Sequence, residues 1–529
     1  AYDMDMYYKD PWLGTIASKA ALRLAEKVGS SNWSGYTPAV STSNIVRNFI
    51  HTVGVNDVGA LFTGIDIGNN ASADAVVQPA APFCPGTYAV KLRVKNNGNN
   101  NLTSVKIAWE INGGTTNYYT HTSTIGLGGE ALISLGNVTF GNAGVHIKAW
   151  TYDPNGVLDP IALDDTLDKV YYAALNGVYT VGGATPNFPD VVTAAKALTD
   201  YGTCGNVVFN IRPGTYAGKV TLTNPVRLSS PNDRVTFQSE NGNASGVTIS
   251  YATSATNDAV IALDGDNYTF RKLTVEASAG NYGQCIGLFN DAKSDSILYC
   301  NITNNATVNT TYNSGVFGYS SYTSFKGKDI IIKGNTIRGG YSGVCIYATS
   351  AGIPENIVID SNDISSNVYC IQSYYVNGGQ ITNNKLTGWP SYNTNYGIWA
   401  YYWLKGPQIL NNRISNVYYT GIYLYSFGGD NKVTNRALMS NNSVVMRPGQ
   451  TGQYGLYMSG SINNTDVLNN TIVNNGSSSS SNNGAYIYFS SGSNNNVYNN
   501  VFANLSGGYA AYYYYLTGYN NNVDYNNYY

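Results

Sequence analysis

The second half of the chain repeats one short motif: an aliphatic residue, two variable residues, Asn, one variable residue and an apolar residue. Ile332-Lys333-Gly334-Asn335-Thr336-Ile337 is the first clear copy. Successive copies place their asparagines 22 to 30 residues apart, and a repeat of this length indicates a solenoid. Cys300 and Leu273 stand at the Asn position in two earlier, divergent copies. The asparagines of the motif are Asn335, Asn362, Asn384, Asn412, Asn442, Asn470, Asn500 and Asn526.

Each repeat carries a second strand-like segment downstream of the Asn motif. Residues 343–347 and 421–425 show its pattern, a Gly followed by alternating inward and outward positions. Because side chains alternate across a strand, the aliphatic residues are predicted to point inward and the aromatic residues outward. Stacked coils lie roughly 4.8 Å apart, so the asparagines are predicted to form an amide ladder along the axis. These features predict an all-β fold, a right-handed parallel β-helix.

The outward aromatic residues are predicted to form two neighbouring rows. Rings in register would stabilise the sheet by roughly 0.2–1 kcal/mol for each cross-strand pair. A large aromatic patch also indicates an interaction site. Another copy of the chain is the preferred occupant, and a glycan or the N-terminal region of the same chain are the alternatives. The predicted interaction stripe consists of Phe317, Tyr319, Tyr347, Trp399, Tyr401, Tyr423, Tyr425, Tyr457, Tyr486 and Tyr488.

The chain contains six cysteines. Cys345 and Cys370 are predicted to occupy the same outward position in neighbouring coils, at a separation within the roughly 4.4–6.8 Å that a disulfide requires. This spacing allows a disulfide between them. The sequence does not pair the others, Cys84, Cys204, Cys285 and Cys300. Since no CxxC pair occurs, no metal site is predicted.

Three domains are predicted. Residues 1–66 form an N-terminal extension in which residues 15–28 have apolar residues at helical spacing and residues 4–8 form an exposed arm or a packed extension. Residues 67–172 contain short alternating segments separated by Asn-Gly turns, which predicts an Ig-like β-sandwich. Residues 173–529 form the β-helix, and a helix at 188–198 is predicted to cap its first coil.

The composition excludes some classes of partner. The formal net charge is −2 and only 11% of residues are charged, so no basic stripe is available to bind nucleic acid. No apolar run approaches the roughly 18 residues that span a bilayer, and no membrane insertion is predicted. The chain begins at Ala1 rather than Met, which agrees with an exported protein. An extracellular or cell-surface location is therefore predicted.

Catalytic residues are not predicted. The three histidines, His51, His121 and His146, all lie before the coils. Glycoside hydrolysis requires converging carboxylates, and lyase chemistry requires a base beside a bound cation. The densest charged group of the coils is interpreted as turn chemistry, and no cofactor is predicted. That group consists of Asp258, Asp264, Asp266, Arg271 and Lys272.

A second acidic group lies in the predicted sandwich. Its oxygens could bind calcium, but their spacing matches no defined calcium loop, so a solvated acidic edge is the preferred interpretation. The group consists of Asp153, Asn155, Asp159, Asp164, Asp165 and Asp168.

Four segments resemble a known family: residues 83–88 (FCPGTY), 96–104 (NNGNNNLTS), 210–216 (NIRPGTY) and 235–239 (VTFQS). They are similar to multi-domain proteins that Bacteroidota-type bacteria secrete by the type IX route. The resemblance implies an Ig-like module before a β-helix similar to that of pectin lyases, at the cell surface or released. The family is functionally mixed. Its members usually end in a sorting domain, whereas this chain ends in a coil-like motif, so either the signal was removed or the open end serves assembly.

These observations predict an exported, non-enzymatic structural protein that self-assembles into a surface fibre or filament through faces rich in Tyr and Asn. A β-helix adhesin or polysaccharide-binding protein is the alternative. A polysaccharide lyase or hydrolase is the third hypothesis.

Overall fold

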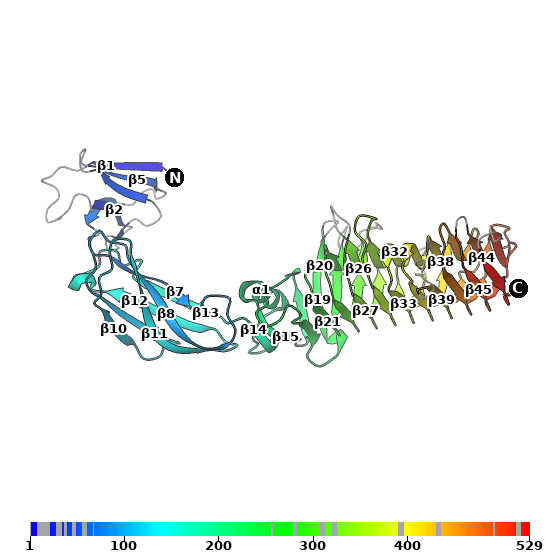
Figure 1. Ribbon diagram of the computed structural model, residues 1–529, viewed down its shortest axis with the longest axis horizontal. Helices are drawn as coiled ribbons and strands as arrows, with labels where there is room; N and C mark the ends of the chain where they lie inside the picture. Colours follow the sequence, from blue (N-terminus) through cyan, green and yellow to red (C-terminus); the bar gives the residue numbers. More distant parts are fainter. Residues whose placement is uncertain are drawn as a thin grey trace. The chain divides into compact units, whose positions relative to one another are not determined.

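The computed structural model describes the strands within residues 2–66 and then residues 68–254, 258–278, 283–305, 313–319, 325–389, 396–429, 435–489, 492–514 and 520–529. The chain divides into two compact units, residues 1–174 and 175–529 (Figure 1). This division falls two residues after the predicted start of the β-helix at residue 173. A separate domain for residues 1–66 stays a prediction.

The described part of residues 1–66 consists of strands. One sheet has the order β1-β5-β4 and another the order β3-β2-β6. The helix predicted at 15–28 is wrong where the chain is described, because residues 22–27 form β2, which pairs antiparallel with β6. Leu22 and Leu24 also fit the period of a strand, and neighbouring strands decide between the two patterns. The strands are β1 (Tyr2–Tyr7), β2 (Leu22–Lys27), β3 (Ser34–Gly35), β4 (Val40–Asn44), β5 (Phe49–Val55) and β6 (Leu61–Asp66).

The predicted exposed arm at residues 4–8 is also wrong where the chain is described. Residues 2–7 form β1, which pairs antiparallel with β5. This partner strand itself lies within residues 1–66, so the alternative, an extension packed on the next domain, stays a prediction.

Residues 71–171 form two antiparallel sheets that enclose one hydrophobic core. The sheets have the orders β11-β8-β7 and β10-β9-β12-β13. Alternate residues of their strands, such as Val90, Leu92, Ile107 and Ile147, are fully buried. The strands are β7 (Ala71–Gln78), β8 (Gly86–Asn96), β9 (Val105–Ile111), β10 (Asn117–His121), β11 (Glu130–Phe140), β12 (Val145–Tyr152) and β13 (Thr166–Tyr171), with a short 3₁₀ turn at Pro154–Gly156.

Residues 175–529 form the predicted parallel β-helix, built from three long parallel sheets (Figure 1). The first sheet contains β14 (Leu175–Val181), β15 (Thr203–Ile211), β18 (Val235–Ser239), β21 (Tyr268–Arg271), β24 (Ser296–Leu298), β27 (Ile331–Lys333), β30 (Val358–Asp360), β33 (Gln380–Thr382), β36 (Gln408–Leu410), β39 (Ala437–Ser440), β42 (Thr465–Leu468), β45 (Asn496–Tyr498) and β48 (Asn522–Asp524).

The second sheet contains β16 (Gly214–Ala217), β19 (Val247–Ala252), β22 (Thr274–Ser278), β25 (Asn301–Asn304), β28 (Thr336–Gly339), β31 (Asp363–Ser365), β34 (Lys385–Thr387), β37 (Arg413–Val417), β40 (Ser443–Met446), β43 (Thr471–Asn474), β46 (Val501–Asn504) and β49 (Asn527–Tyr528).

The third sheet contains β17 (Val220–Thr223), β20 (Ala259–Asp264), β23 (Gln284–Phe289), β26 (Ser314–Tyr319), β29 (Ser342–Tyr347), β32 (Tyr369–Asn377), β35 (Tyr396–Leu404), β38 (Thr420–Tyr425), β41 (Tyr454–Ser459), β44 (Asn483–Tyr488) and β47 (Ala511–Tyr514).

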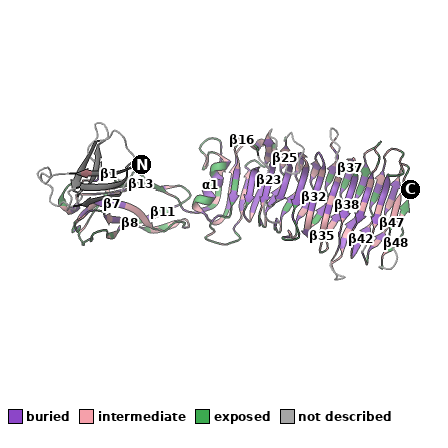
Figure 2. Ribbon diagram, turned by 90° about the horizontal axis from the view of Figure 1, so that it is seen from above, coloured by how far each residue is buried: buried purple, intermediate pink, exposed green. Residues whose placement is uncertain are grey.

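Aliphatic columns fill the interior of the β-helix. In the first sheet, Ile332 pairs with Ile359, which pairs with Ile381, which pairs with Ile409. All four side chains are fully buried, and the strands of the β-helix are largely buried along their length (Figure 2). Branched side chains suit this position because they pack well against like neighbours on a pleated surface.

Helix α1 (Val191–Tyr201) packs on the first coil. Asp190 caps its N-terminus, because the Asp190 carboxylate accepts a hydrogen bond of 2.7 Å from the Thr193 backbone N–H. Val191, Ala194 and Leu198 form its buried face. The helix begins three residues after the predicted start at Phe188, whose ring instead contacts Phe209 with centroids 5.7 Å apart.

The turn before each ladder asparagine uses a left-handed residue. From Lys272 to Tyr525, the residue that precedes the ladder position has φ between +53° and +69°. Asn and Gly tolerate this region best, which explains the repeated Asn-Asn pairs such as 411–412 and 441–442. This left-handed position was not predicted from the sequence, although the Asn-Asn pairs signal it.

The disulfide considered between Cys345 and Cys370 does not form, because both are buried free thiols. Cys345 pairs with Gln372 across the third sheet, and Ser342 pairs with Tyr369. Cys370 therefore stands opposite Gly343, two residues from the assumed register. Successive residues rise roughly 3.3 Å along a strand, so this shift moves the two sulfur atoms apart.

The described thiols are expected to resist labelling in the native protein. Burial raises the pKa of Cys285 and Cys370 to about 12 and that of Cys300 to about 11, and it raises the pKa of Cys345 as well. Since the thiolate is the reactive form, these four should react with a thiol reagent only in denaturant. Mass spectrometry of the labelled protein would check this, and native labelling of Cys345 would contradict it.

No helix within the described part of the chain has the length and hydropathy that a membrane crossing requires.

Candidate functional site

The eight motif asparagines form one column at the turns between the first and second sheets. The Asn412 side-chain oxygen accepts hydrogen bonds of 3.0 Å from both the backbone N–H and the amide of Asn384. The Asn412 amide donates to the Ile381 carbonyl and to the Asn442 side-chain oxygen, each at 2.9 Å. The same pattern runs from Asn335 to Asn526. From Asn335 to Asn500 each amide therefore donates both to a backbone carbonyl and to the next asparagine of the column, which stabilises the coils rather than offering a free binding surface.

A shorter polar column precedes the first-sheet strands. The Asn495 side-chain oxygen accepts a hydrogen bond from Thr465, and the Asn495 amide donates to Asn521 and to the Ile462 carbonyl. Asp295 holds the equivalent place before β24, where its Oδ1 accepts the Tyr268 backbone N–H at 2.8 Å. Its Oδ2 is buried with no hydrogen-bond partner. Burial raises the pKa of Asp295 to about 8. Neither the shorter column nor the buried carboxylate of Asp295 was predicted from the sequence.

The aromatic residues stand in two columns on the outer face of the third sheet. In one column, Trp399 pairs with Tyr423, which pairs with Tyr457, Tyr486 and then Tyr512. The other column holds the remaining rings, interrupted by Ser459 between Tyr425 and Tyr488. We define the aromatic band as Tyr347, Tyr374, Trp399, Tyr401, Tyr423, Tyr425, Tyr457, Tyr486, Tyr488, Tyr512 and Tyr514.

Rings of the aromatic band stack along the axis. Centroids of Tyr423 and Tyr457 lie 5.1 Å apart with 4° between the planes, and those of Tyr457 and Tyr486 lie 5.0 Å apart with 8°. Tyr401 and Tyr425 stack at 4.6 Å and 7°. Neighbouring rings therefore occupy one another's faces, and the band presents mainly ring edges and side-chain tips to its surroundings.

The side chains of the predicted interaction stripe differ in how far they are exposed to solvent. Tyr347 is 42% exposed, and the other members of the band are half-buried except Tyr514, which is also exposed. Phe317 is only 2% exposed, so its prediction as part of an exposed stripe is wrong. Its neighbours along that column, Cys345 and Gln372, are not aromatic and are also buried. The side chain of Tyr319 lies outside the described residues.

A third group of rings flanks the aromatic band. Tyr369 and Tyr396 stack at 4.8 Å and 3°, and Tyr396 contacts Tyr423 edge-on at 6.0 Å. Tyr454 likewise contacts Tyr457 edge-on at 5.2 Å. These tyrosines widen the aromatic surface. They begin the third-sheet strands, and the signal that could have found them is the Tyr immediately before Gly397 and Gly455.

The third sheet is uncharged over most of its length. Nine consecutive strands, from β23 to β47, contain no Asp, Glu, Lys or Arg. Charged residues of the same coils lie in the turns and on the other two sheets. On the first sheet Lys333 pairs with Asp360, and on the second Arg338 pairs with Asp363, each at 2.9 Å. The aromatic band is thus a neutral, partly apolar surface between charged ones.

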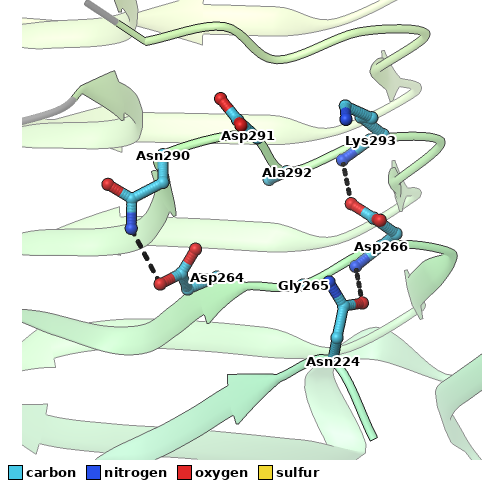
Figure 3. Close-up of a pocket in the computed structure, with 8 residues that line it drawn as sticks. All are labelled: Asn224, Asp264, Gly265, Asp266, Asn290, Asp291, Ala292 and Lys293. Atoms are coloured by element: carbon cyan, nitrogen blue, oxygen red, sulfur yellow. Dashed lines mark hydrogen bonds between the residues drawn. The ribbon is translucent and has the colours of Figure 1, made fainter. Parts of the chain in front are cut away.

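Acidic residues of the early coils line a pocket of about 300 Å³ (Figure 3). Asp264 and Asp266 lie on either side of Gly265 rather than converging. The Asp264 carboxylate accepts from the Asn290 amide at 2.8 Å, and that of Asp266 accepts from the Lys293 backbone N–H at 3.0 Å. Asp258 pairs with Lys219 at 2.8 Å. These contacts connect successive turns, which agrees with the turn interpretation of the group.

The acidic group of the sandwich is only partly a solvated edge. Asp153 and Asp168 lie at the surface, paired with Lys106 at 2.8 Å and with His146 at 2.5 Å. Asp159 is 7% exposed, which contradicts the prediction for that residue. Burial raises the pKa of Asp159 and of Asp164, and burial together with these two carboxylates raises the pKa of Asp165 to about 8.

Comparisons with known proteins agree with the architecture. A family model described as a right-handed beta helix region matches residues 342–528. A search of curated protein sequences found no significant match.

Solved structures with a similar fold include three of different function. One is a mannuronic acid specific family 6 polysaccharide lyase from human gut microbiota, with 12% identity, a TM-score of 0.38 and coverage of 66% of this chain and 82% of that one. Another is PfbA, a surface adhesin of Streptococcus pneumoniae, with 12% identity, a TM-score of 0.35 and coverage of 64% and 88%.

The third is the catalytic domain of a GH87 alpha-1,3-glucanase, with 11% identity, a TM-score of 0.36 and coverage of 96% and 99%. At these values the three proteins share no more than a general architecture with this chain, and their different functions give no guide to its own.

Proposed function

We propose that this chain is a non-enzymatic extracellular structural protein whose β-helix associates laterally with a second copy through the aromatic band, as the unit of a surface fibre or filament. The observation that carries the proposal is the uncharged third sheet with its pre-stacked rings. The extracellular location rests on the resemblance of four segments between residues 83 and 239 to secreted surface proteins.

A neutral face suits contact between identical chains. In a two-fold contact the same patch occurs on both partners, so every charge on it must find an opposite charge on an identical surface. Strands β23 to β47 avoid this requirement because they carry no charge. Stacked rings also have little rotamer freedom left to lose on binding, and Tyr gives contact area while its hydroxyl tolerates water.

Ring geometry disfavours the glycan alternative. A sugar ring that packs on an aromatic residue needs an open ring face, as other stacked ligands do. In the aromatic band, Tyr423 has Trp399 stacked on one side at 5.7 Å and Tyr457 on the other at 5.1 Å. Most faces are therefore occupied, and polysaccharide binding remains an alternative outcome of the test.

Pocket geometry disfavours the enzyme alternative. The carboxylates of Asp264 and Asp266 accept hydrogen bonds from neighbouring turns and lie on either side of Gly265. Glycoside hydrolysis needs two carboxyl groups that flank one bond, whereas each of these two carboxylates is hydrogen-bonded to the neighbouring turn.

The sandwich is part of the proposal as an Ig-like module. Its first, second and fifth strands form one sheet, and its third, fourth, sixth and seventh form the other. The constant-type Ig arrangement differs only in the fourth strand, which joins the first sheet there.

Sedimentation velocity over a range of concentrations tests the proposal. The wild-type chain is expected to gain mass with concentration. The double substitution Tyr457→Lys with Tyr486→Lys places like charges on both partners of the contact, and it is expected to weaken association at least tenfold. The matched control is Ser443→Lys with Val445→Lys, at exposed positions of β40 in the second sheet, and it should associate as the wild type does.

A wild-type chain that stays monomeric at every concentration would overturn the proposal. Monomers that bind a polysaccharide through Tyr457 and Tyr486 would support the adhesin alternative instead. Release of sugar products by the wild type, but not by Asp264→Asn or Asp266→Asn, would support the enzyme alternative.

A further inference from the structure

Three carboxylates gather at one end of the sandwich, in the segment between β12 and β13. Asp159 Oδ2 accepts the Ala71 backbone N–H at 2.8 Å, and its Oδ1 accepts the Ile161 backbone N–H at 2.9 Å. Asp165 Oδ1 lies 3.4 Å from the Thr151 hydroxyl. These contacts hold the carboxylates against the start of β7.

Two asparagine side chains donate hydrogen bonds to the third carboxylate, that of Asp164. Asp164 Oδ2 accepts from the Asn97 amide at 2.9 Å and from the Asn70 amide at 3.4 Å. The other oxygens of this contact have no donor: both Asp164 Oδ1 and Asn70 Oδ1 are buried without a hydrogen-bond partner. Asn70 is 3% exposed, and its amide end lies directly against Asp164.

No positive side chain balances this group. None of the ion pairs formed among the described residues includes Asp159, Asp164 or Asp165. Buried carboxylates are normally paired or bound to metal, because an isolated buried charge is costly. Likewise, a buried amide oxygen without a donor costs about 1–3 kcal/mol. A cation would satisfy the two oxygens without a donor, Asp164 Oδ1 and Asn70 Oδ1, together.

We propose that this end of the sandwich binds a calcium ion, with Asp164 and Asn70 as ligands and with water and backbone carbonyls completing the coordination. The nearby carboxylates of Asp159 and Asp165 add negative charge that favours a cation there. Calcium accepts six to eight oxygen ligands from carboxylates, amides, backbone carbonyls and water in flexible geometry. Zinc is disfavoured because it selects His and Cys ligands, and neither residue type contributes to this group.

Mixed ligands are essential to the site. No three acidic, His or Cys side chains of the described residues are placed to chelate an ion by themselves. The amide oxygen of Asn70 and bound water would therefore have to complete the coordination. The bound ion would join the segment between β12 and β13 to the first strand of the opposite sheet and stabilise the sandwich.

Isothermal titration of the chelator-treated full chain with CaCl₂, and separately with MgCl₂, tests the inference. Calcium is expected to bind at one site and more tightly than magnesium. The substitutions Asp164→Asn and Asn70→Ala should each weaken calcium binding at least tenfold. Asp168→Asn, which changes an exposed carboxylate on the same edge, is the matched control and should bind as the wild type does. Circular dichroism confirms that each variant is folded.

The absence of calcium-dependent heat in the wild type would overturn the inference, as would equal affinity in Asp164→Asn. Asp165→Asn provides an independent readout. If the carboxylates only repel one another, Asp165→Asn will unfold at a higher temperature than the wild type. Calcium will then leave the unfolding temperatures of both proteins unchanged. If the site binds calcium, the ion will raise the unfolding temperature of the wild type more than that of Asp165→Asn.

Discussion

Replacing Asn412 by leucine is expected to lower the free energy of unfolding by about 3–6 kcal/mol, because it leaves two or more buried polar groups unbonded. The side chain is completely buried in the middle of the ladder. Leucine has a similar volume, so the cost comes from lost hydrogen bonds rather than from a cavity. The Asn384 backbone N–H and the Ile381 carbonyl would each lose the hydrogen bond that they make to Asn412.

Guanidinium unfolding followed by fluorescence measures this effect. The matched control is Asn411→Gly, one residue away. Asn411 is exposed with φ of +57°, and glycine adopts this conformation readily, so its stability should change by less than about 0.5 kcal/mol. Similar stabilities for Asn412→Leu and the wild type would show that the amide column contributes little to the fold.

Replacing Asp295 by asparagine is expected to stabilise the protein by roughly 2–5 kcal/mol above pH 8, since it removes a buried acceptor that would otherwise carry charge. Asn495 shows how an amide fits this column: its Oδ1 accepts from Thr465 and its Nδ2 donates to the carbonyl three residues earlier, at Ile462. At position 295 the equivalent donor is the Tyr268 backbone N–H. The new amide is therefore expected to donate to the carbonyl three residues before Tyr268, which is that of Gly265.

The gain should depend on pH in a defined direction. The pKa of Asp295 rises from 3.8 to about 8 on folding, so the folded chain holds this proton more tightly than the unfolded chain does. Its contribution to the free energy of unfolding is complete below pH 4 and is lost as pH rises through 8. The variant lacks this loss, so the difference between the two proteins should grow between pH 4 and pH 8.

Unfolding curves of the wild type and Asp295→Asn across this pH range measure the effect. Asp291→Asn, an exposed carboxylate in the adjacent turn, is the control and should leave both stability and its pH dependence nearly unchanged. A constant difference between wild type and Asp295→Asn at all pH values would mean that Asp295 does not titrate on folding.

Much of the β-helix could be predicted from sequence because its coils repeat. From Asn335 to Asn500 each ladder asparagine recurs with an apolar residue three positions before it and another two positions after it, and these apolar residues are buried in the interior. A pattern that recurs in many coils distinguishes a strand from a helix even where one copy is ambiguous. Residues 22–27 occur only once, and their apolar residues fit both the helical period and the strand period. Their strand pairing with β6 depends on residues 61–66, which no local pattern of residues 15–28 could reveal.

The aromatic band could be predicted only in outline. Alternation along β38 and β41 placed Tyr423 and Tyr457 on one face, and their register follows from the Gly before each segment. The register of β29 against β32 could not be read in this way, because β32 begins with Tyr369 and Cys370 and lacks that Gly. The predicted disulfide failed for this reason. Phe317 failed because the outward direction of a side chain does not reveal what covers it.

Site-directed cross-linking through the aromatic band tests the central claim most directly. Tyr457→Cys places a new thiol on the band, while the native thiols of the described residues stay buried; Val445→Cys, on the second sheet, is the control. Lateral association through the band predicts that mild oxidation converts Tyr457→Cys into a disulfide-linked dimer and leaves Val445→Cys monomeric. Equal cross-linking of both variants, or of neither, would contradict the account.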